Sequence, residues 1–77
     1  MAFLAVVDKK LIAKNIGVAL RRLRIDQNLS MKELATLAEI EKSQIYRIEK
    51  GKVDVRVSTM YLLATTLKVD VKEFFQF

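Results

Sequence analysis

Apolar residues recur in the first third of the chain at spacings of four, four and three, which places them on one face of an α-helix. These residues are Ile12, Ile16, Leu20 and Leu23. Asp8 can cap a helix that begins at Lys9, and Asn28 suits a left-handed end to it. Gly17 lies in the middle of this helix, where glycine is unfavourable, so we expect another helix to pack closely there.

Two shorter helices are predicted next. Ser30 and Glu33 have the spacing of a capping box, so a second helix is expected from there to about Ala38. Residues 39–41 form a turn. A third helix is predicted over residues 42–50, with apolar residues inward and Gly51 as a left-handed cap. The inward residues are Leu34, Ala35, Ile40, Ile45 and Ile48.

A fourth helix is predicted to begin between Arg56 and Ser58 and to end at Leu67. Asp70 and Glu73 offer a second capping box, which would open a short last helix. The pattern therefore predicts an all-α fold, a compact domain of five helices over residues 9–77. Residues 1–8 form a short apolar N-terminal extension, in which only residues 3–7 have any strand character.

The composition excludes several function classes. Among the 77 residues there is no Cys and no His, so disulfides, thiolate metal sites and the commonest general base are missing. No catalytic or phosphate-cradling motif is present. We expect no enzyme activity, no metal and no cofactor.

The charge favours an anionic partner. The net charge is +5, and residues 42–56 hold five basic and two acidic residues. A basic surface can simply keep a protein soluble, but this concentration favours nucleic acid. The apolar run over residues 2–7 lacks the basic lead-in of a signal peptide and is too short to span a bilayer. We expect a cytoplasmic protein.

The central residues resemble the lambda-repressor-like, Cro-type (XRE) family of helix-turn-helix DNA-binding domains. The resemblance covers roughly residues 12–75 at unbroken spacing. It is carried by Leu23-Arg24, Leu29-Ser30, Glu33-Leu34-Ala35, Ala38, Ile40, Ile45, Ile48-Glu49 and Gly51-Lys52. It implies that the third helix enters the major groove of DNA.

The resemblance also implies roles for individual residues. Base edges would be read by Lys42, Ser43 and Arg47, with Gln44 and Tyr46 beside them, although for these two a solvated role is expected equally. Phosphates would be met at the start of the second helix and in the loop after the third. The phosphate set is Ser30, Met31, Lys32, Lys50, Lys52 and Arg56. Arg24 and Glu49 would form a structural ion pair.

Three features depart from the family pattern, and the third of them is the apolar N-terminal extension. Met31 stands where a Gln commonly reaches DNA, and a thioether cannot donate to phosphate. Glu39 stands where the turn usually has Gly, so we expect a non-glycine residue at positive φ there.

Large apolar residues at both ends of the chain suggest a homodimer, because exposed apolar patches usually mark an interface. The predicted interface residues are Leu67, Val71, Phe74, Phe75 and Phe77, with residues 3–7 as helpers. The N-terminal arm can equally fold back onto its own core.

The sequence thus predicts a dimeric transcriptional regulator that binds double-stranded DNA at an inverted repeat. Small phage-type repressors and restriction–modification controller proteins share this plan. The alternative is an antitoxin-like interaction module whose apolar ends bind a partner protein.

Overall fold

The first element of the structure is a helix with a side-chain N-cap. The computed structural model describes residues 8–76. Helix α1 (Lys9–Asp26) has Asp8 as its N-cap, whose carboxylate accepts from the backbone N–H of Leu11 at 3.1 Å. The helix ends at Asp26 with Gln27 as its C-cap, and Asn28 follows in the predicted left-handed conformation, with φ 57°.

The predicted helix-turn-helix is present. Helix α2 (Met31–Ala38) opens with the capping box, in which Ser30 Oγ accepts from the N–H of Glu33 at 2.9 Å and the Glu33 carboxylate accepts from the N–H of Ser30 at 2.8 Å. Glu39 is left-handed, with φ 58° and ψ 42°. Helix α3 (Lys42–Glu49) then follows, and Gly51 has the expected positive φ of 68°.

The C-terminal part differs from the prediction in its last element. Helix α4 (Val57–Leu67) starts and ends as expected, but a left-handed Lys68 with φ 58° ends it, which the sequence did not indicate. The last helix, η1 (Val71–Phe75), is a 3-10 helix. Asp70 accepts from the N–H of Lys72, one residue earlier than in a capping box. The fold of residues 8–76 is therefore four α-helices and one 3-10 helix.

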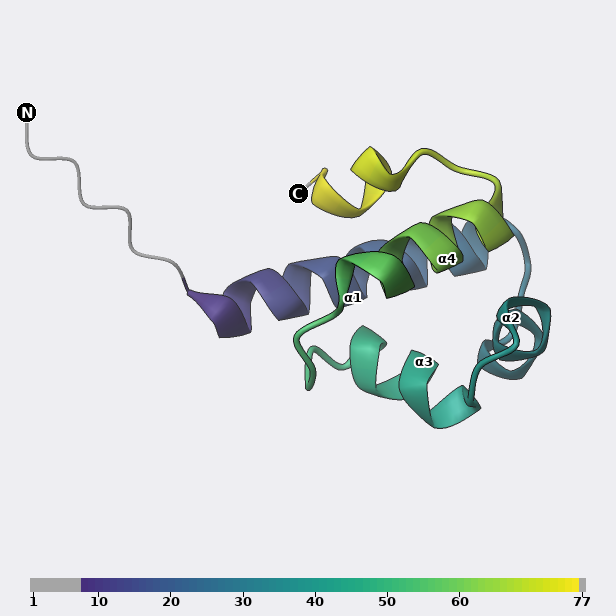
Figure 1. Ribbon diagram of the computed structural model, residues 1–77, viewed down its shortest axis with the longest axis horizontal. Coiled ribbons are helices and arrows are strands. Elements are labelled where there is room, and N and C mark those ends of the chain that lie inside the picture. Colours follow the sequence, from purple (N-terminus) through teal and green to yellow (C-terminus); the bar gives the residue numbers. More distant parts are fainter. Residues whose placement is uncertain (1–7, 77) are drawn as a thin grey trace, which may run out of the picture.

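The long helix α1 organises the arrangement in space. It packs against α3 and against η1, while α4 packs against α2 and η1 (Figure 1). The core between these elements is aliphatic apart from Phe74, and its fully buried side chains are Phe74, Leu20, Leu34, Ile45, Leu63 and Leu67.

Ile12 lies on the predicted face of α1 but outside the core. Ile16, Leu20 and Leu23 are buried, but Ile12 is 40% exposed. The first turns of α1 project beyond the other helices (Figure 1). Helical spacing identifies a face, but it cannot tell how far along the helix that face is covered.

Gly17 marks a close helix contact, as expected. A Cβ at this position would collide with the carbonyl oxygen of Ile48 and would lie 2.9 Å from that of Glu49. Both acceptors are backbone atoms of α3, which cannot move aside as a flexible side chain would. Only glycine therefore lets α3 approach α1 this closely.

The Arg24–Glu49 pair forms as the family resemblance implied. Arg24 Nε donates to Glu49 Oε2 at 2.6 Å and Nη2 donates to Oε1 at 2.9 Å. Nη1 donates to the carbonyl of Leu29 at 2.8 Å. The hydrogen bonds with Glu49 raise the pKa of Arg24 despite the opposing effect of burial. The side chains are only 10% and 2% exposed, so removing one partner leaves a buried charge alone.

We predict that Glu49→Ala lowers the free energy of unfolding by about 3–5 kcal/mol, because Arg24 then stays charged without its acceptor. Denaturant unfolding measures this change. Asp26→Ala removes an exposed carboxylate at the end of the same α1 and serves as the matched control, with little expected effect. A loss below about 1 kcal/mol in Glu49→Ala would contradict a structural role for the pair.

We predict that Glu39→Gly raises the free energy of unfolding by about 1 kcal/mol. A side chain at positive φ costs about 1–2 kcal/mol, and the flexibility of glycine in the unfolded chain takes part of that gain back. The melting temperature should rise by several degrees while DNA binding is kept. Glu39→Ala removes the carboxylate but keeps Cβ, and an equal rise in that variant would refute backbone strain as the cause.

Candidate nucleic-acid interface

Helix α3 keeps one polar face free. Ile45 and Ile48 point into the core, and the intervening positions face outward. All five residues predicted to read bases are exposed, namely Lys42, Ser43, Gln44, Tyr46 and Arg47. The helix is fixed to the core on one side, so the five side chains form one continuous surface for a polar partner.

Gln44 has a role in the helix itself. Its Oε1 accepts from the backbone N–H of Glu41 at 3.2 Å and so helps to cap the start of α3. Reading adenine with both amide atoms would compete with this bond. The sequence did not indicate the cap, since its usual signal is a Ser or Thr at the first position.

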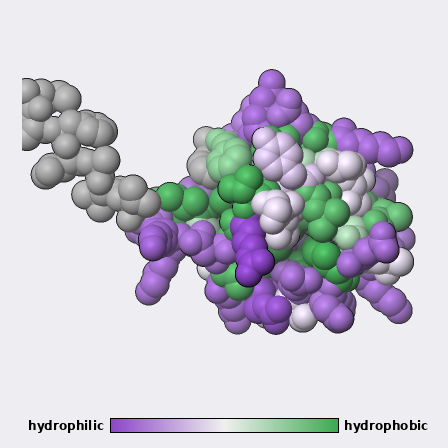
Figure 2. Space-filling model, viewed as in Figure 1, coloured by the Kyte–Doolittle hydropathy of each residue, from purple (hydrophilic) through white to green (hydrophobic). Residues whose placement is uncertain are grey.

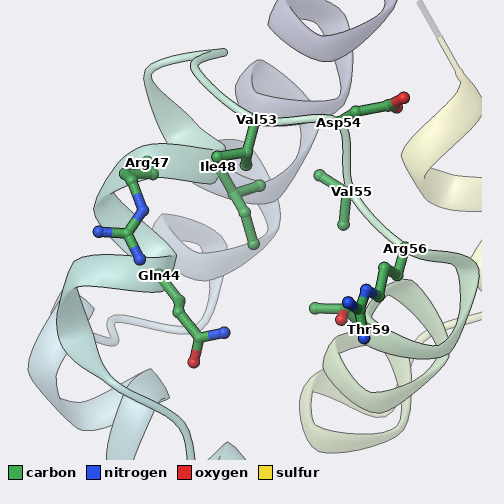
Figure 3. Close-up of a pocket in the computed structure, with 8 residues that line it drawn as sticks. All are labelled: Gln44, Arg47, Ile48, Val53, Asp54, Val55, Arg56 and Thr59. Atoms are coloured by element: carbon green, nitrogen blue, oxygen red, sulfur yellow. The ribbon is translucent and has the colours of Figure 1, made fainter.

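A shallow hollow of about 350 Å³ lies between α3 and the start of α4 (Figure 3). Arg47 and Gln44 border it from α3, while Arg56 and Thr59 border it from the start of α4. The carboxylate of Asp54 points away from it. Two guanidinium groups at the edges of one open hollow suit a phosphate strand. Sequence reasoning missed this pairing because residues nine positions apart come together only in the fold.

The start of α2 offers backbone donors. Helix geometry leaves the first N–H groups, including those of Met31 and Lys32, without intrahelical partners. Ser30 is occupied by the capping box, and the Met31 side chain packs against the core. Hydrogen bonds from Ser30 hold the pKa of Glu33 below its usual value. Any phosphate contact at Met31 must therefore use its backbone N–H, as expected for a thioether.

Tyr46 belongs to the exposed face of α3 and lies near two lysines that follow the helix. The ammonium groups of Lys50 and Lys52 lie 5.6 Å and 5.7 Å from the centre of its ring. All three side chains are exposed. The structure thus associates Tyr46 with two lysines of the predicted phosphate set.

The predicted dimer surface needs correction. Leu67 and Phe74 are fully buried in the core of the single chain, so neither can supply exposed surface to a partner. Val71 is half-buried and Phe75 is 51% exposed. Phe77 and residues 3–7 lie outside the described residues.

Other exposed apolar residues were not predicted. Tyr61 and Leu62 are exposed on α4, which packs beside η1. Apolar side chains gather over the middle of the molecule in Figure 2, between hydrophilic margins. Helical spacing places Met60, Leu63, Ala64 and Leu67 inward, as they are in the structure, and so leaves Tyr61 and Leu62 outside the core without indicating an interface.

Within residues 8–76, no cluster of acidic side chains is placed to hold a metal ion. No helix in the same part of the chain is long and apolar enough to cross a membrane.

An α2–turn–α3 unit with an exposed polar α3 defines a helix-turn-helix protein. Residues 20–74 match the family model described as helix-turn-helix, HTH_3, and the chain belongs to this family. A candidate HTH-type transcriptional regulatory protein of Methanothermobacter thermautotrophicus is 34% identical over 55 residues, which cover 71% of this chain and 18% of the relative. The chain thus spans under a fifth of that protein.

Solved structures share the fold. The restriction–modification controller protein C.AhdI of Aeromonas hydrophila is 32% identical, with a TM-score of 0.79 over 82% of this chain and 96% of that one. An HTH_3 family transcriptional regulator of Vibrio cholerae is 25% identical, with a TM-score of 0.84 over 88% of this chain and 38% of the other. The similarity covers nearly all of C.AhdI but less than half of the Vibrio regulator.

Proposed function

We propose that this chain is a transcriptional regulator that binds double-stranded DNA sequence-specifically, as a dimer, at an inverted-repeat operator. The observation that carries the proposal is the α3 surface: an exposed polar and basic face on a helix fixed rigidly to α1. Membership of the helix-turn-helix family and the similarity to a restriction–modification controller protein support it. Such a regulator would act in the cytoplasm, where prokaryotic DNA lies.

The contacts divide into base reading and anchoring. Lys42, Ser43 and Arg47 would reach base edges, and Arg47 can donate to O6 and N7 of a guanine. Gln44 would contribute less, because its Oε1 is engaged in the cap. On the other side of the hollow, Arg56 would meet the sugar–phosphate strand, which adds affinity without specificity.

A dimer would place two α3 helices about 34 Å apart, on one face of the duplex. Its interface would use the exposed apolar residues of α4 and η1 in place of the buried Leu67 and Phe74. Those exposed residues are Tyr61, Leu62 and Phe75, and the half-buried Val71 would join them. Their chemistry also suits the alternative function, an antitoxin-like module that covers this surface with a partner protein.

We predict that selection from random duplexes enriches a palindromic sequence. Arg47→Ala should relax the base preference at one position in each half-site, because one base contact is lost. The binding free energy for the preferred sequence should weaken by about 1–3 kcal/mol. Lys52→Ala should weaken binding equally for all sequences, because phosphates carry no sequence information. Binding with a steep salt dependence but without any enriched sequence would leave only a non-specific DNA-binding role.

We predict a dimer at micromolar concentration by sedimentation velocity. Phe75→Glu should dissociate it, because a charge would then be buried at the interface. Val18→Glu makes the same change at an exposed apolar residue of α1 and should leave the dimer intact. A wild-type chain that sediments as a clean monomer would contradict the homodimer and favour the partner-protein alternative.

A further inference from the structure

Two lysines follow the C-terminal end of α3, and neither forms an ion pair with a carboxylate. Lys50 and Lys52 are both exposed, and the only ion pair within residues 8–76 is Arg24–Glu49. Lys50 N–H donates to the carbonyl of Tyr46 at 3.0 Å, and Lys52 N–H donates to that of Arg47 at 2.9 Å. The backbone of both lysines is therefore fixed to the last turn of the helix.

A third lysine joins them from a distant part of the chain. Gly51 packs so tightly against α1 that a Cβ added to it would lie 2.8 Å from Lys14 Cα and 3.2 Å from Lys14 Cβ. The Lys14 side chain is exposed and starts directly beside the Gly51 turn. The fold thus places the backbone of Lys14 beside Gly51, the residue between Lys50 and Lys52, although 36 residues separate Lys14 from Lys50.

The Tyr46 ring organises two of these lysines. Its centre lies within 6 Å of both ammonium groups, the range in which a cation is attracted to the face of an aromatic ring. A lysine side chain otherwise samples many rotamers, and fixing them costs entropy on binding. The ring therefore restricts two ammonium groups to one region before a ligand arrives.

We infer that Lys14, Lys50 and Lys52 form one phosphate-binding cluster at the C-terminal end of α3, and that Tyr46 is the positioning residue of this cluster. Lys14 thereby becomes a DNA contact from α1, outside the helix-turn-helix. The expected ligand is a backbone phosphate of the DNA bound by α3, so the inference rests on the proposed function. The competing explanation is that the lysines only complement the negative end of the α3 dipole.

The experiment measures the affinity for a fixed random-sequence duplex at several salt concentrations. Lys14→Ala should lower the slope of log affinity against log salt by about one, because one phosphate contact is lost. Lys72→Ala removes an exposed lysine on η1 and should leave the slope unchanged. A slope for Lys14→Ala equal to that of Lys72→Ala would overturn the phosphate cluster.

Two substitutions of Tyr46 distinguish the role of its ring from that of its hydroxyl group. Tyr46→Leu should weaken binding to all sequences about two- to fivefold, whereas Tyr46→Phe keeps the ring and should bind like the wild type. In a Lys50→Ala/Lys52→Ala background, Tyr46→Leu should have no further effect. Sequence-dependent losses in Tyr46→Phe, or a full effect of Tyr46→Leu in that background, would overturn the positioning role.

Two controls separate the possible failures. Thermal melting checks that each variant is folded. If the dipole explanation is right, Lys14→Ala, Lys50→Ala and Lys52→Ala will change the melting temperature but not the salt slope, and the inference fails. If the wild-type chain itself binds no duplex, the proposed function fails first. If the wild type binds with a steep salt slope and Lys14→Ala has the same slope as Lys72→Ala, the inference fails while the proposed function stands.

Discussion

The fold depends on a close contact between α1 and α3, made at two points of one helix face. Gly17 lets the backbone of α3 approach, and Arg24, seven residues later, holds the Glu49 side chain. A buried ion pair is stabilising only when its geometry is complete, and here each Nη and Nε of Arg24 has an acceptor. Backbone contact and ion pair both act on Glu49, so the last turn of α3 is fixed in position and in rotation.

This fixed orientation connects the core to the proposed function. With Glu49 held against α1, Ile45 and Ile48 fill the core and the remaining positions of α3 must face outward. The residues proposed to contact DNA therefore need no contacts of their own to be exposed. The same contact brings Gly51 against α1 beside Lys14, and on this proximity rests the proposed extension of the basic surface beyond the two helices of the motif.

Local signals allowed most elements to be predicted from the sequence, because caps and helical spacing act over a few residues. Ser30, Glu39 and Gly51 all behave as expected. Local signals do not tell which residues are covered by neighbours. Ile12 lies on the predicted face of α1 but beyond the core, and Leu67 and Phe74, predicted for a partner surface, belong to the core. For the site, exposure of α3 was predictable, whereas the hollow beside Arg56 and the lysines around Tyr46 depend on the fold.

The left-handed residues at the ends of α2 and α4 have a consequence for turnover. Glu39 and Lys68 occupy positions where glycine would be relaxed. Each strained residue costs about 1–2 kcal/mol, a noticeable share of the stability of a small domain. The cost raises the fraction of unfolded molecules, which is the form that proteases degrade. Two backbone angles thus take up part of the small stability margin of the domain.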